Sequence, residues 1–141
     1  MFDNLSEDTN PSLIKFEQML KTNQVLFFDA LEFENIIHHY IDFAQFNLAK
    51  KAIKMGMEQH PENVELMLLK SELFLVDGSF NEAENMLNDI ERISPEHEEI
   101  FLQRANIFSK KKNHPKAIEF LKKALNVSEE PTEIWNLLGM E

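Results

Sequence analysis

Three polar side chains near the start of the chain have the spacing at which one helix could offer metal ligands. Glu34, His38 and Asp42 follow one another at intervals of four residues, so they would share one helical face in successive turns. Carboxylate and imidazole groups are ordinary zinc ligands. The same spacing is common on solvated helices, however, and no fourth ligand is in view. We therefore expect neither a metal site nor any other cofactor.

The rest of the sequence offers little for catalysis. The chain has no Cys, hence no thiolate chemistry. It has no Gly-rich phosphate loop and no Ser-His-Asp order. The run Lys110–Lys112 is expected at the end of a helix, where cations interact favourably with the helix dipole. We predict that the protein is not an enzyme.

Composition and charge narrow the class of partner. The 141 residues, 43% of them hydrophobic, are enough for a buried core, and the low Gly and Pro content favours an all-α fold. A formal charge of −11 would repel nucleic acids and anionic membranes. No run of about 18 apolar residues and no signal peptide is present. We expect a cytoplasmic protein without nucleic-acid or membrane partners.

Residue types recur along the chain at an interval of 34 residues, which indicates an internal repeat. No insertion interrupts the interval. The matching columns are Ala49, Ala83 and Ala117; Phe33, Met67, Phe101 and Trp135; Tyr40, Phe74 and Phe108; Ile53, Leu87 and Leu121; and Pro61 and Pro95.

Each interval has the pattern of two amphipathic helices joined by a short turn. Small residues fall where the two helices would cross closely. They are Ala49, Ala83 and Ala117 on the second helix, and Ser71, Ala105 and Gly139 on the first. Gly56 is expected late in a second helix, and Gly78 in a turn that can require a positive φ.

These residues resemble the tetratricopeptide repeat (TPR) family, whose units are 34-residue helical hairpins. The resemblance covers residues 30–141 and implies an all-α, right-handed solenoid of stacked antiparallel hairpins. The expected units are 30–63, 64–97 and 98–131, with a partial unit at 132–141. Ile37 and Ile90 depart from the family pattern at small positions, and Ala44 and Lys112 depart from it at the turn glycine.

Residues 1–29 precede the repeat. Asn10 and Pro11 predict the start of a helix, and Asp29 with Glu32 predicts a capping box for the first repeat helix. Two interpretations of residues 12–28 stay open. The segment could cover the exposed apolar end of the solenoid, or it could fold back into the groove and block it.

The resemblance implies a concave groove lined by the first helix of each hairpin. These columns contain no Lys or Arg, so the clamp with which some family members bind a terminal carboxylate cannot form. We instead predict a protein or peptide partner with apolar anchors and basic flanks. The expected groove residues are Leu31, Glu34, His38, Glu65, Leu68, Glu72, Leu75, Glu99, Leu102, Asn106, Glu133 and Asn136. Leu68 and Leu102 could instead pack within the solenoid.

The chain ends inside the fourth hairpin pattern, two residues after Gly139. We interpret the chain as the N-terminal part of a longer array, with residues 132–141 as the truncated first helix of a fourth repeat. The alternative is a natural end, in which residues 132–141 form a terminal capping helix. The third unit would then expose apolar residues, and self-association through them is possible. Two function hypotheses remain: an interaction scaffold that binds through the groove, and a docking or regulatory arm of a longer protein with another activity.

Overall fold

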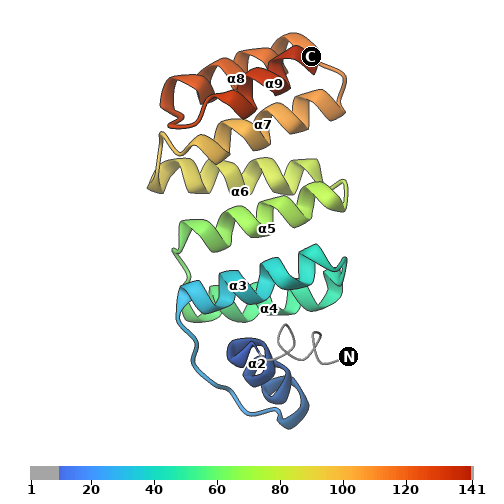
Figure 1. Ribbon diagram of the computed structural model, residues 1–141, viewed down its shortest axis with the longest axis vertical. Helices are drawn as coiled ribbons and strands as arrows, with labels where there is room; N and C mark the ends of the chain where they lie inside the picture. The colour runs from blue at the N-terminus through green and yellow to red at the C-terminus, as the bar shows by residue number, and fades with distance from the viewer. Residues whose placement is uncertain (1–9, 141) are drawn as a thin grey trace. The chain divides into compact units, whose positions relative to one another are not determined.

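The computed structural model describes residues 10–140, and all regular structure in that range is α-helical. The chain divides into two compact units, Met1–Leu66 (unit 1) and Met67–Glu141 (unit 2), which are described separately. Helix α5 begins in the first and continues in the second. The helices (Figure 1) are α2 (Pro11–Thr22), α3 (Ala30–Asp42), α4 (Phe46–Gln59), α5 (Val64–Val76), α6 (Phe80–Ile93), α7 (Glu98–Lys110), α8 (His114–Val127) and α9 (Thr132–Met140).

The helix starts predicted in unit 1 are confirmed. The Asn10 side chain accepts hydrogen bonds from the backbone N–H groups of Ser12 and Leu13, and Pro11 occupies the first turn of α2. At α3, Asp29 and Glu32 form the reciprocal capping box. The Ser12 hydroxyl also donates to Glu32. This bond, followed by the backbone bond to Asp29, lowers the pKa of Glu32.

An aromatic cluster joins α2 to α3. Phe16, Phe28, Phe33 and Tyr40 are all fully buried. The Phe16 ring lies 6.1 Å from both Phe28 and Tyr40, and Phe28 lies 5.3 Å from Phe33. Rings at these separations attract one another in addition to the hydrophobic effect. The cluster places α2 against the first repeat helix, and a capping role for residues 12–28 stays a prediction.

The extended segment between α2 and α3 is held by side chains at the end of α4. The Gln59 amide accepts a hydrogen bond from the Phe28 N–H and donates one to the Leu26 carbonyl. The His60 ring lies 2.8 Å from the Phe28 carbonyl. These bonds satisfy backbone groups that lack partners in a helix or sheet.

The small residues that the repeat places at helix crossings are buried. Ala49, Ala83 and Ala117 have no exposed surface. A Cβ atom at Gly56 would lie 3.1 Å from the Phe33 ring and 3.3 Å from Leu66, so that crossing requires a glycine-sized residue. Ile37 is also fully buried, so the core accommodates the larger side chain at that position.

The turns inside the hairpins repeat at the same interval of 34 residues. Ala44, Gly78 and Lys112 all have positive φ, at 55°, 77° and 62°. Each turn closes with the same two backbone bonds of a Schellman motif. In the first turn, the Ala44 N–H donates to Ile41 and the Gln45 N–H donates to Tyr40; the same pairs recur 34 and 68 residues later.

Unit 2 has its own apolar core. Between α7, α8 and α9 the buried members are Ala105, Leu121, Ala124 and Ile134. On α9, however, the predicted crossing at Gly139 is not formed, because a Cβ atom there would meet nothing within 4 Å. Trp135 on the same helix is 61% exposed. The 34-residue pattern identifies the positions of small and aromatic residues. These positions form a close helix crossing only where a second helix packs against them.

Candidate functional site

The predicted groove residues are divided between the two units. Four of them lie in unit 1: Leu31, Glu34, His38 and Glu65. The other eight lie in unit 2. Six of these eight line one groove, and they are Glu72, Leu75, Glu99, Leu102, Asn106 and Glu133. These six residues share one depression in unit 2, and their role in binding stays a prediction.

In unit 1 the predicted residues form a partly polar surface. Leu31 is 63% exposed. Glu34 is half-buried, and this burial raises its pKa; the nearby Glu65 raises it further, whereas His38 lowers it. Within residues 10–140, no group of three or more His, Asp or Glu side chains is arranged to hold a metal ion. Glu34, His38 and Asp42 share a helix without forming a metal centre.

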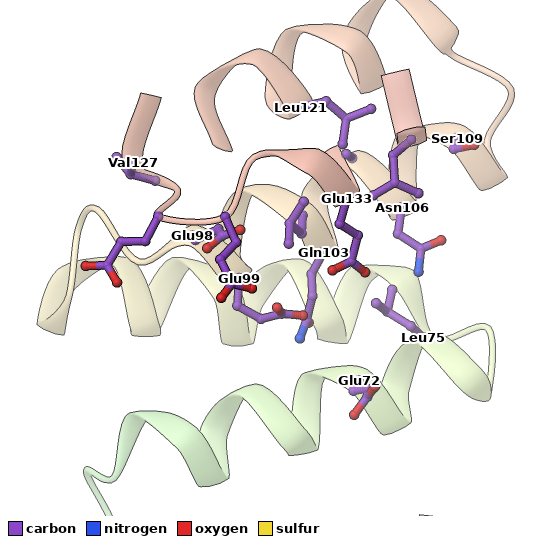
Figure 2. A pocket seen from close by; sticks show the side chains of 15 residues that line it. Glu72, Leu75, Glu98, Glu99, Gln103, Asn106, Ser109, Leu121, Val127 and Glu133 are labelled. Atoms are coloured by element: carbon purple, nitrogen blue, oxygen red, sulfur yellow. The ribbon is translucent and has the colours of Figure 1, made fainter. Parts of the chain in front are cut away.

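The depression in unit 2, called the acidic groove below, has a volume of about 840 Å³. Side chains from α5, α7, α8, α9 and the connection between α8 and α9 point towards it (Figure 2). It is lined by Glu72, Leu75, Glu98, Glu99, Leu102, Gln103, Ala105, Asn106, Ser109, Leu121, Val127, Glu129, Glu130, Glu133 and Leu137. Six of these are glutamates and none is Lys or Arg.

Burial and charge in the groove raise the pKa of one of its glutamates. Glu99 is half-buried, and burial raises the pKa of its carboxyl group; the charges of Glu72 and Glu98 raise it further. The Gln103 amide donates a hydrogen bond to Glu99, and this bond acts in the opposite direction. The nearest arginine in sequence, Arg104, instead binds Asn88 and Glu91 outside the groove.

Apolar side chains supply the rest of the surface. Leu75, Leu102 and Leu137 are half-buried and line the groove between the carboxylates. Partly covered leucines of this kind can lose their remaining exposed area when a ligand binds, at about 25 cal/mol per Å². The groove therefore combines apolar contact area with an excess of negative charge.

Two predicted residues are placed differently. Leu68 is 4% exposed, and its carbonyl accepts a hydrogen bond from the Gln103 amide. Its apolar side chain is part of the packing and offers a partner almost no surface, so the alternative interpretation of Leu68 is the better one. Asn136 is exposed but does not line the groove, because α9 turns a different face towards it.

The sequence did not point to several residues of the lining, among them Gln103, Glu98 and the pair Glu129 and Glu130. The last two belong to the connection between α8 and α9, which has no counterpart in the helical columns. A signal was present, since acidic residues are dense between 129 and 133. Gln103 gave no signal, because a lone amide in a helix is usually exposed.

Comparison with known proteins identifies the fold. The sequence matches no protein-family model and no curated protein sequence. Two similar solved structures are TPR proteins. TTC0263, a thermophilic TPR protein of Thermus thermophilus, is 22% identical with a TM-score of 0.72, over 91% of this chain and 70% of that one. YrrB, described as a TPR protein with an unusual peptide-binding site, is 18% identical with a TM-score of 0.74, over 94% of this chain and 67% of that one.

The chain therefore has the all-α fold of TPR proteins, in which antiparallel helical hairpins stack as a solenoid, as the 34-residue interval predicts. One protein with this fold, YrrB, is described as having an unusual peptide-binding site. Every helix within residues 10–140 is too short or too polar to cross a lipid bilayer.

Proposed function

We propose that this protein is an interaction scaffold whose acidic groove binds a segment of a partner protein that carries apolar anchors and Lys or Arg side chains. The observation that carries the proposal is the lining of the groove. Six glutamates surround half-buried leucines, and no lysine or arginine is among the lining residues. Such a surface attracts cationic segments and repels nucleic acids and other polyanions.

The size of the groove supports a peptide-like ligand. About 840 Å³ is within the range of roughly 300–1,000 Å³ that is usual for ligand sites. This space is sufficient for several side chains but not for a folded domain. YrrB, which shares the fold, is described as having a peptide-binding site.

The two kinds of lining residue would have different tasks. Burial of Leu75, Leu102 and Leu137 would supply affinity that depends little on salt. The carboxylates of Glu72 and Glu133, which are exposed, would increase the association rate and select a basic sequence, and their effect would weaken as salt is added. The proposal predicts binding without chemical change of the partner.

Fluorescence anisotropy with synthetic peptides tests this function. The probes are labelled ten-residue peptides in which leucines and arginines are combined at several spacings, and a matched set with glutamate in place of arginine. We expect only the basic set to bind, more weakly at high salt. The double variant Glu72→Lys and Glu133→Lys should reduce the affinity by about tenfold or more.

A matched control is available in unit 1. The double variant Glu58→Lys and Glu62→Lys changes the net charge equally at exposed positions outside the groove, and it should retain nearly full affinity. Equal losses in the two double variants would show that only the overall charge matters. Binding of neither peptide set would overturn the proposed function.

A further inference from the structure

The most unusual polar group in the acidic groove is the side-chain oxygen of Gln103. Gln103 lies on α7 and is 6% exposed. Its Nε2 donates a hydrogen bond to the Leu68 carbonyl, at 3.2 Å, and the amide also interacts with the Glu99 carboxylate. Both acceptors favour the nitrogen end of the amide, which fixes the orientation of the amide group.

Because the amide is fixed in this way, its oxygen has no donor to face. Oε1 of Gln103 is buried and accepts no hydrogen bond from the described residues. A buried polar atom without a partner is destabilising because its desolvation is not compensated, and such atoms are rare in folded proteins. The amide belongs to the lining of the groove, beside Glu99 and across from Glu72 on α5 (Figure 2). An unpaired acceptor in the lining of the groove suggests a ligand that carries hydrogen-bond donors.

The groups around Gln103 are acceptors as well. Glu99 lies one turn earlier on the same helix, and its carboxylate is partly withdrawn from water with Glu72 and Glu98 as its charged neighbours in the groove. Asn106 lines the same groove. The site thus has several oxygen acceptors, one of them orphaned, and no cation among its lining residues to match them. A ligand group with a positive charge and several N–H donors would complete it.

A guanidinium group meets this requirement better than other cations. It presents five N–H donors in one plane, has no acceptor of its own and is more weakly hydrated than an ammonium group. It can therefore engage a carboxylate and an amide oxygen at once. A metal ion fits less well, because no three acidic or histidine side chains of residues 10–140 converge on one point. The leucines Leu75 and Leu102 beside the carboxylates suit the methylene chain of an arginine.

We propose that the acidic groove contains a specific subsite for one arginine side chain of the partner. The Glu99 carboxylate and the Gln103 Oε1 atom accept its guanidinium N–H groups, and Leu75 and Leu102 contact its methylene chain. This inference rests on the proposed function of the groove. Because Oε1 is buried, the guanidinium reaches it only when a neighbouring side chain moves.

Three probe peptides isolate the guanidinium group. Each has the sequence Leu-Ala-X-Ala-Leu with a fluorescent label, and X is arginine, lysine or citrulline. Citrulline has nearly the shape of arginine without its charge. For the unmodified protein we expect arginine to bind about tenfold more tightly than lysine, a difference of about 1.4 kcal/mol, and citrulline to bind most weakly.

Variants of the two acceptors then test the assignment. Glu99→Gln should weaken the arginine peptide by about tenfold, since a charge-assisted bond is lost. Gln103→Met, which keeps the approximate volume, should remove the preference for arginine over lysine. Glu130→Gln, an exposed change in the same groove, is the matched control and should retain that preference.

NMR provides a readout that does not depend on the folding of a variant. When the arginine peptide is added to the unmodified protein, the side-chain amide signals of Gln103 and the carboxyl signal of Glu99 should shift more than the carboxyl signal of Glu130. If the peptides bind with the same affinity whether X is arginine or lysine, or if the signals of Glu99 and Gln103 do not move, the arginine subsite is wrong although the groove still binds. If no peptide binds, the subsite and the proposed function both fail.

Discussion

Units 1 and 2 each bring a glutamine amide into the packing between helices, and the two amides are used differently. Gln59 in unit 1 uses both ends of its amide, on the backbone N–H of Phe28 and the carbonyl of Leu26. Gln103 in unit 2 uses only its N–H groups, and its oxygen has no partner among the described residues. The Gln59 amide is satisfied within unit 1, whereas the Gln103 oxygen is the acceptor that we propose a ligand uses.

The carboxylates of the two units show the same contrast. In unit 1, hydrogen bonds from Ser12 and from the backbone of Asp29 lower the pKa of Glu32. In unit 2, burial and neighbouring carboxylates raise the pKa of Glu99. The hydrogen bonds at Glu32 favour its charged form, whereas burial and the neighbouring carboxylates disfavour the charged form of Glu99. This contrast supports the proposal that the partner binds to unit 2.

The largest test of this comparison concerns the aromatic cluster of unit 1. Phe16→Ala removes a fully buried ring that contacts Phe28 and Tyr40, and we expect a loss of about 3–5 kcal/mol in the free energy of unfolding. Trp135→Ala in unit 2 removes a ring that is 61% exposed and should cost less than about 1 kcal/mol. Urea unfolding followed by circular dichroism measures both. If the two variants lose similar amounts of unfolding free energy, the contrast between the packed aromatic cluster of unit 1 and the exposed ring of unit 2 is wrong.

The two glutamines give the next largest difference. Gln59→Leu leaves the Phe28 N–H and the Leu26 carbonyl without partners and should destabilise the protein by about 1–3 kcal/mol. Gln103→Leu removes one bond to Leu68 but also removes the orphaned oxygen, so we expect a smaller loss or none. Hydrogen exchange of the Phe28 amide should accelerate only in the first variant. If Gln103→Leu is the more destabilising change, Gln103 is a structural residue.

The turns allow a test in which the units should respond alike. Ala44 in unit 1 and Lys112 in unit 2 have positive φ, which costs a residue with a side chain roughly 1–2 kcal/mol. Glycine avoids that cost but loses more entropy on folding. Ala44→Gly and Lys112→Gly should each stabilise the protein by about 0.5–1 kcal/mol, and Gly78→Ala should destabilise it similarly. Thermal unfolding checks the three signs, and a destabilising glycine at either position would contradict the expectation.

The smallest effects should appear in the pH dependence of stability. The folded pKa of Glu32 is below its ordinary value of 4.5, so its stabilisation is present above that pH and is lost as the pH falls through the folded pKa. Glu32→Gln should therefore destabilise the protein at pH 7 and matter less at pH 3. The folded pKa of Glu99 is above 4.5, so Glu99→Gln should stabilise at pH 7, again with a smaller effect at pH 3. Urea unfolding curves of both variants at pH 7 and pH 3 measure these effects. If the two substitutions change the free energy of unfolding in the same direction at pH 7, the prediction is wrong.

Local residue patterns were enough to predict the helices, the capping box and the turns. The Asp29–Glu32 box depends on residues three apart, and the turn positions follow from the 34-residue interval. Each of these features depends on residues that are only a few positions apart in the sequence. Such short-range preferences are therefore readable without knowledge of the packing.

The groove was predicted only in part, because its lining depends on contacts between distant residues. The columns include Glu72, Glu99 and Leu102, which line the acidic groove. They also placed Leu68 there, although helix packing buries that side chain. Gln103 acquires its importance only when α7 brings its amide against the Leu68 carbonyl. No pattern along one helix contains that information.

The identical closure of the turns at Ala44, Gly78 and Lys112 has a consequence for how the gene can change. Each hairpin closes through bonds within six consecutive residues, so the gain or loss of 34 codons would add or remove a hairpin without altering how the others close. A single inserted codon within a helix would instead rotate everything after it by about 100°. Ala83 or Ala117 would then leave the crossing that requires it. Selection should therefore tolerate duplication of whole repeats far more readily than small insertions inside them.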